Sequence, residues 1–67
     1  MGEKISKIFQ IVEKYGGTAA RIQLAQKTGI TASKALDIEE TDELLKKVKD
    51  IASQLLGKRI EEFDPNI

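Results

Sequence analysis

The chain of 67 residues contains no cysteine, no histidine and no tryptophan, and it has a single proline. Without cysteine it forms no disulfide, and without cysteine or histidine it lacks the usual ligands of zinc and iron–sulfur sites. The absence of cysteine fits a reducing compartment, so we expect a cytoplasmic protein. The commonest catalytic bases and nucleophiles are missing too, and we therefore expect neither enzymatic activity nor a bound cofactor.

Long apolar runs are also absent. No stretch of about 18 apolar residues could span a membrane, and Met1–Lys4 lacks the apolar core of a signal peptide. A chain of this length forms one domain at most and offers little room for a small-molecule pocket. We expect a single helical domain over residues 1–63, a short tail over residues 64–67, and no small-molecule substrate.

Charge of one sign is not in excess, because 11 cationic and 11 acidic residues cancel. Residues 1–34 nevertheless hold six cations and two acids, whereas residues 35–67 hold nine acids and five cations. The basic half favours contact with nucleic acid, although the overall positive charge typical of nucleic-acid-binding proteins is missing. The acids near residue 42 suit the start of a helix, where the helix dipole favours negative charge.

Helical periodicity is the dominant pattern that the sequence does have. A first helix is predicted from about residue 4 to residue 15, ended by the pair Gly16 and Gly17. Thr18 is a natural cap for a second helix that reaches about residue 28. The apolar face of the first helix follows the spacing i, i+3, i+4, i+7 with Ile5, Ile8, Phe9 and Val12.

Two further helices are predicted after Gly29. Thr31 or Ser33 can cap a short third helix that ends near residue 38, and a fourth runs from a cap at Thr41 to a stop at Gly57. The expected fold is all-α, a small four-helix orthogonal bundle with a helix-turn-helix-like core. After Gly57, we expect the apolar residues near the C-terminus to fold back on the bundle.

The fourth helix has an apolar stripe wider than the second and third helices obviously cover. Either the first helix covers the remainder or a second copy of the chain does, so a monomer and a homodimer both stay open. In a homodimer, Leu45 and Leu56 would lie in the interface. The stripe consists of Leu44, Leu45, Val48, Ile51, Ala52, Leu55 and Leu56.

Residues 22–38 carry the features that two short helices need to meet at a steep angle across a short turn. The small Ala25 precedes Gly29 by four positions, Ile30 follows the glycine, and further apolar residues return at Ala35 and Ile38. This order resembles the helix-turn-helix of DNA-binding proteins. The resemblance implies a small regulatory protein that binds DNA.

In that docking mode the start of the second helix of the motif faces base edges. Ser33 and Lys34 would then contact bases or phosphates, and Thr31 would contribute to specificity. The backbone phosphates would be bound by Thr18, Arg21 and Lys27. Residues 31–38 contain no Arg, Asn or Gln, the side chains that read guanine and adenine with two hydrogen bonds.

Residues 24–36 also resemble the first loop and second helix of ubiquitin-associated domains, with Thr28 and Gly29 in the turn and Ala35 and Leu36 in the helix. This second resemblance implies a three-helix module that binds proteins through an apolar patch, for which a neutral chain is well suited. The sequence therefore leaves two functions open. One is DNA binding, and the other is protein–protein interaction or oligomerisation without nucleic acid, with a second copy or a larger protein as partner.

Overall fold

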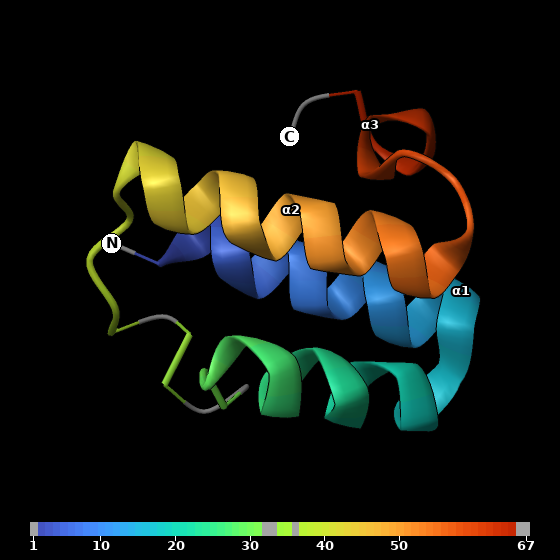
Figure 1. Ribbon diagram of the computed structural model, residues 1–67, viewed down its shortest axis with the longest axis horizontal. Helices are drawn as coiled ribbons and strands as arrows, with labels where there is room; N and C mark the ends of the chain where they lie inside the picture. The colour runs from blue at the N-terminus through green and yellow to red at the C-terminus, as the bar shows by residue number, and fades with distance from the viewer. Residues whose placement is uncertain (1, 32–33, 36, 66–67) are drawn as a thin grey trace.

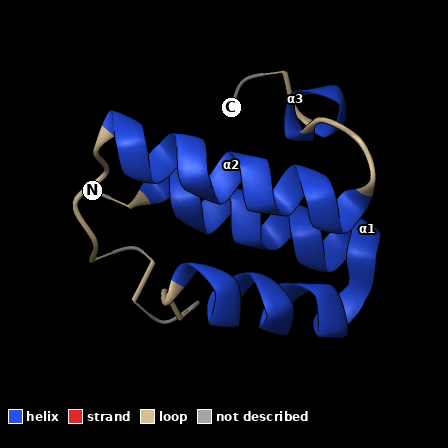
Figure 2. Ribbon diagram, in the orientation of Figure 1, coloured by secondary structure: helices blue, strands red, loops and turns tan. Residues whose placement is uncertain are grey.

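The computed structural model describes residues 2–31, 34–35 and 37–65. These residues form α1 (Glu3–Thr28), α2 (Asp42–Leu56) and the one-turn α3 (Ile60–Phe63). The part of the chain that is described contains no strand (Figure 2). The all-α prediction is confirmed, whereas the expected four-helix count is not found among the described residues.

α1 is bent at Gly17, whose φ of 85° and ψ of 176° are not helical. The bend divides α1 into a first segment (residues 3–16) and a second segment (residues 18–28), which match the first two predicted helices. The second segment runs in the direction opposite to the first segment and to α2 (Figure 1). Backbone angles of this kind are essentially restricted to glycine, so the residue type at position 17 produces the reversal.

Gly16 is required for a different reason. A Cβ atom at this position would lie 2.8 Å from the Cβ of Ala20 and 3.1 Å from the Cδ2 of Leu56. The missing side chain therefore lets the end of α2 approach the bend of α1. This contact makes Leu56 part of the packing between α1 and α2.

The hydrophobic core is built mainly by the first segment of α1 and is completed by every other element. The other apolar residues of the α2 stripe are partly buried and pack against this core. Both segments of α1 and the C-terminal turn therefore cover most of the stripe within a single chain. The buried apolar side chains are Ile5, Ile8, Phe9, Ile11, Val12, Leu24, Ile30, Ala35, Val48, Ala52 and Ile60.

The ends of the helices follow the predicted caps. The hydroxyl of Thr41 accepts a hydrogen bond of 3.1 Å from the backbone N–H of Leu44 at the start of α2. Gly29 ends α1 and Gly57 ends α2, each with a positive φ. A left-handed residue at this position lets the backbone N–H bond back to a free carbonyl of the last turn, and glycine adopts it without a steric penalty.

The C-terminal turn folds back on the bundle, as the sequence predicted. Ile60 is fully buried, and its backbone N–H donates a hydrogen bond of 2.9 Å to the hydroxyl of Ser53 in α2. The ring of Phe63 lies against that of Tyr15, with 4.7 Å between the ring centroids. α3 is therefore tied to both long helices.

The described residues between 31 and 38 form turns in place of the predicted third helix. The N–H of Lys34 bonds to the carbonyl of Thr31, and the N–H of Asp37 to the carbonyl of Lys34, each at 3.0 Å. A helix of eight residues gains few hydrogen bonds against its nucleation cost, and acids at its C-terminal end oppose its dipole. Both family resemblances relied on a helix here, and the predicted contact residue Ser33 lies outside the described residues.

Glu40, which follows these turns, stabilises the start of α1. One of its carboxylate oxygens accepts a hydrogen bond of 3.0 Å from the backbone N–H of Ile5, 35 residues earlier in the chain. The first N–H groups of a helix have no partner within the helix, and the positive end of the helix dipole favours a carboxylate. The connection between α1 and α2 is thereby fixed to the start of α1.

Glu40→Ala is expected to lower the free energy of unfolding by about 1 kcal/mol, because it removes a capping carboxylate. Glu39→Ala deletes the same charge at the exposed neighbouring position and is the matched control, with an expected change within about 0.5 kcal/mol. Urea unfolding followed by circular dichroism measures both. Equal losses for the two variants would show that the charge of this connection matters and the hydrogen bond to Ile5 does not.

Candidate functional site

The residues proposed to contact DNA do not form one compact basic surface. Lys27, Thr31 and Lys34 are exposed near the end of α1 and in the connection that follows it. Thr18 is exposed at the opposite end of the second segment, beside the bend. Arg21 is partly covered, and its Nε lies 2.7 Å from a carboxylate oxygen of Glu13 in the first segment. The positive charge of Arg21 is thus balanced within the chain.

After Gly29, apolar and polar side chains differ in burial at the described positions, although no helix is described there. Ile30 and Ala35 are buried, whereas Thr31 and Lys34 are exposed. Thr28 stabilises the start of this turn, since its hydroxyl donates to the carbonyl of Leu24 at 2.7 Å and accepts from the N–H of Ile30 at 3.3 Å. The apolar residues of this segment therefore pack inward at the described positions, where turns and no helix are found.

Negative charge gathers at the end of the molecule that holds this turn. The connection from α1 to α2 lies where both helices begin (Figure 1). Acidic side chains here would repel the phosphates of a duplex that approached Lys34. The exposed acids in this connection and in the first turns of the two helices are Glu3, Asp37, Glu39, Asp42 and Glu43.

The two residues proposed for a dimer interface, Leu45 and Leu56, are partly buried and pack against the core. Leu56 reaches the bend of α1, where the absence of a side chain at Gly16 makes room for it. Neither leucine is among the large apolar side chains that are exposed in the described part of the chain. The apolar stripe of α2 thus packs against the core of its own chain.

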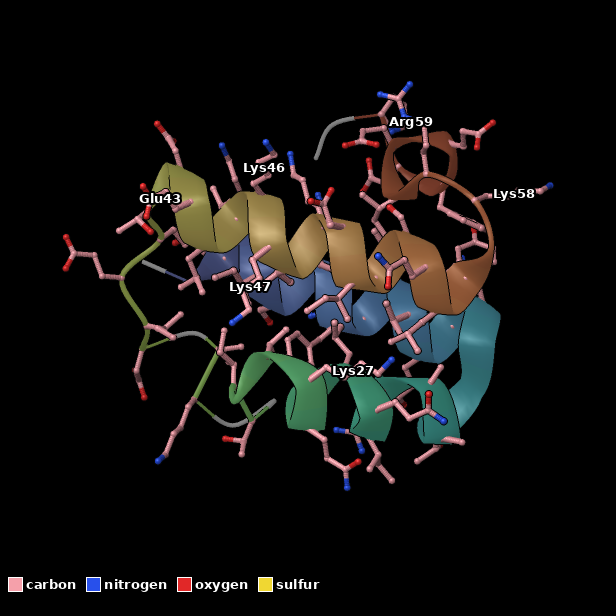
Figure 3. The ribbon with its side chains drawn as sticks, viewed as in Figure 1. Lys27, Glu43, Lys46, Lys47, Lys58 and Arg59 are labelled. Atoms are coloured by element: carbon pink, nitrogen blue, oxygen red, sulfur yellow. The ribbon has the colours of Figure 1, made fainter. Side chains whose placement is uncertain are left out.

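A hollow of about 470 Å³ lies where α2 meets α3. Two of its lining cations, Lys58 and Arg59, project outward from the molecule in Figure 3 and do not converge on a common point. Gln54 and Glu62 also line the hollow. Because these two cations point away from the hollow, they do not fix a ligand within it.

In contrast to the charged surfaces described above, the outer side of the second segment carries no charged side chain. We call the five exposed residues there the uncharged face: Thr18, Ala19, Ile22, Gln23 and Gln26. Ile22 is 47% exposed and, with Tyr15, is one of two exposed large apolar residues in the described chain. At about 100° per residue, Ile22 points almost directly away from Leu24, which is fully buried.

The sequence indicates this face through a scarcity of charged residues and not through the positions of its cations. A third of all residues are charged, yet residues 15–26 include one charged residue, Arg21. Arg21 lies beside the inner side of the segment and is paired with Glu13. The stretch of sequence with few charged residues therefore corresponds to the uncharged face.

No protein-family model matches this chain, and comparisons with curated proteins and with solved structures found no match. Among the described residues, no helix is long and apolar enough to cross a membrane.

Proposed function

We propose that this chain is a small protein-interaction module that acts through the uncharged face of the second segment of α1, without catalysis. The exposure of Ile22 at the centre of a surface free of charged side chains carries the proposal. The rest of the surface is rich in lysine, glutamate and aspartate, which are depleted in the buried centres of protein interfaces.

Covering the uncharged face costs little free energy of desolvation. A partner that covers the uncharged face removes methyl groups, amides and a hydroxyl from water, and none of these carries the cost of burying an unpaired charge. The side chain of Ile22 supplies apolar area whose removal from water favours binding. The ion pair between Arg21 and Glu13 balances the charge of Arg21, so a partner need not supply a counter-charge for it, and the exposed Lys27 lies at the edge of the face.

Photo-crosslinking tests this function. A photoreactive residue placed at position 22, in the centre of the uncharged face, is expected to yield a protein adduct in extracts of the source cells. The same residue at position 54, an exposed position on α2, is the matched control and is expected to yield none. The proposal fails if position 22 gives no adduct, or if both positions give the same adducts.

DNA binding by a helix-turn-helix is the second candidate, and one observation favours it. The turn at Gly29 is followed by buried Ile30 and exposed Thr31 and Lys34, the pattern that this motif needs. In this candidate, residues 31–38 wind into a helix on DNA, starting from the two turns between Thr31 and Asp37. Ser33 would then join Thr31 and Lys34 at the bases, with Thr18, Arg21 and Lys27 at the phosphates.

A titration of random-sequence duplex DNA at several salt concentrations separates the two candidates. Binding by three cations would weaken steeply as salt rises, because each neutralised phosphate releases counterions. For the interaction module we expect no measurable binding even at low salt. Binding that Lys34→Glu abolishes, while Glu39→Lys strengthens it, would favour the DNA candidate instead.

A further inference from the structure

We propose that residues 58–65, which we call the latch, open and close as one unit while α1 and α2 stay folded. The latch contains α3 and lies on the side of α2 away from the second segment of α1 (Figure 1). It is therefore separate from the uncharged face, and the inference stands independently of the proposed function. The structure shows the closed state, and opening exposes apolar surface that the latch covers.

The latch is held closed mainly by two apolar side chains. Ile60 is fully buried, and Phe63, three residues later, is partly buried against the core. Residues at this spacing lie on the same side of a helical turn, so one side of the latch faces the bundle. At its end, the carboxylate of Asp64 lies 3.9 Å from the ammonium group of Lys7 in α1. A rotation of the latch away from α2 would break these contacts together.

These contacts are strong enough to close the latch but not to hold it closed permanently. Burying an isoleucine side chain favours the closed state by roughly tenfold to a hundredfold. The ion pair of Lys7 and Asp64 contributes little, because the lysine side chain is exposed. Ordering the backbone of the latch opposes closure. We therefore expect the open state in about 0.1–10% of molecules, the range of a typical minor conformation.

The surroundings of the latch permit opening without loss of α2. Gly57 joins α2 to the latch with a positive φ of 75°, and no atom lies within 4 Å of the place that a Cβ would take. Glycine has access to more backbone conformations than other residues, so position 57 can serve as the hinge. The groups left behind can bond to water. They are the hydroxyl of Ser53, which accepts the N–H of Ile60 in the closed state, and Tyr15, which is already 52% exposed.

The latch opens as a whole because a single helical turn does not persist by itself. α3 has four residues, and so short a helix is unfavourable without tertiary contacts. Once Ile60 and Phe63 leave the bundle, the turn unwinds. The other buried apolar side chains belong to α1, to the turn after Gly29 and to α2, so these elements keep their shared core. The molecule therefore has a closed and an open state with no stable form between them.

Amide hydrogen exchange of the full chain, followed by NMR, tests the latch. The N–H groups of Ile60 and Asp64 both donate hydrogen bonds in the closed state, of 2.9 Å and 3.2 Å. We expect the two amides to have the same protection factor, at least about tenfold lower than those of the buried Val12 and Val48 in the long helices. Phe63→Ala is expected to lower both by the same factor, about fivefold or more, and to leave the protection of Val12 and Val48 unchanged.

Lys58→Ala is the matched control, because Lys58 is exposed and belongs to the same segment. It is expected to change none of these protection factors. Protection of Ile60 equal to that of Val48 would show that the latch opens only when the whole chain unfolds, and this overturns the inference. It is overturned as well if protection falls from Ile60 to Asp64, which indicates fraying from the chain end, or if Phe63→Ala lowers the protection of Val48 by the same factor.

Discussion

Leu24→Ala is expected to lower the free energy of unfolding by about 2–5 kcal/mol, the range for removing a large apolar side chain from a packed core. Leu24 is the one apolar side chain of the second segment that is fully buried. A chain of this size has a total stability of roughly 3–10 kcal/mol. The variant should therefore unfold in large part, or lose the attachment of its second segment to the rest.

Ile22→Ala is the matched control for this substitution. It lies two residues away in the same helical segment and removes a comparable side chain that is 47% exposed. Because most surface substitutions change stability little, we expect an effect within about 0.5 kcal/mol. Urea unfolding of the two variants measures the difference. Similar losses of stability in both would show that Ile22 contributes to packing and is not free for a partner.

Gly17→Ala is expected to destabilise the fold by about 1–3 kcal/mol, because position 17 has backbone angles essentially restricted to glycine. The space around it is not limiting, since no atom lies within 4 Å of the place that a Cβ would take. The loss would thus come from backbone strain alone. A Cβ at this position also favours continuing α1 as one straight helix, which would separate the second segment from the first.

Gly29→Ala provides the comparison, because Gly29 has a positive φ of 73° with ψ of 12° and equally open surroundings. That left-handed conformation costs other residues about 1–2 kcal/mol, whereas the glycine-only combination of positive φ and ψ near 180° at Gly17 costs them about 1–3 kcal/mol. Thermal unfolding by circular dichroism ranks the two variants. A smaller loss for Gly17→Ala than for Gly29→Ala would contradict the role given to the bend.

The sequence predicted the elements whose signals are local. The glycines at positions 17, 29 and 57 and the threonine at 41 mark helix ends or the bend through their own backbone preferences and hydrogen bonds. The periodicity of Ile5, Ile8 and Val12 predicted the buried side of the first segment. These signals act within a few residues, so no knowledge of the tertiary structure was needed to interpret them.

The parts that the sequence did not predict depend on distant contacts. The described residues after Thr31 form turns in place of the predicted helix. The carboxylate of Glu40, which follows them, bonds to the start of α1 in a contact that spans 35 residues. The pairing of Arg21 with Glu13 likewise depends on how the bend brings the two segments together. The expectation that Arg21 binds phosphate overlooked this partner. The exposed side of the second segment likewise depends on the burial of Leu24 in the core.

Recovery of bound partners from the source cells tests the central claim most directly. The wild-type chain, Ile22→Lys and Gln54→Lys would be compared as affinity-tagged baits at low and high salt. The account predicts that a bound protein, either a second copy or another chain, is recovered with wild type and Gln54→Lys at both salt concentrations and is lost with Ile22→Lys. Equal recovery with Ile22→Lys, or recovery of nucleic acid that high salt removes, would contradict it.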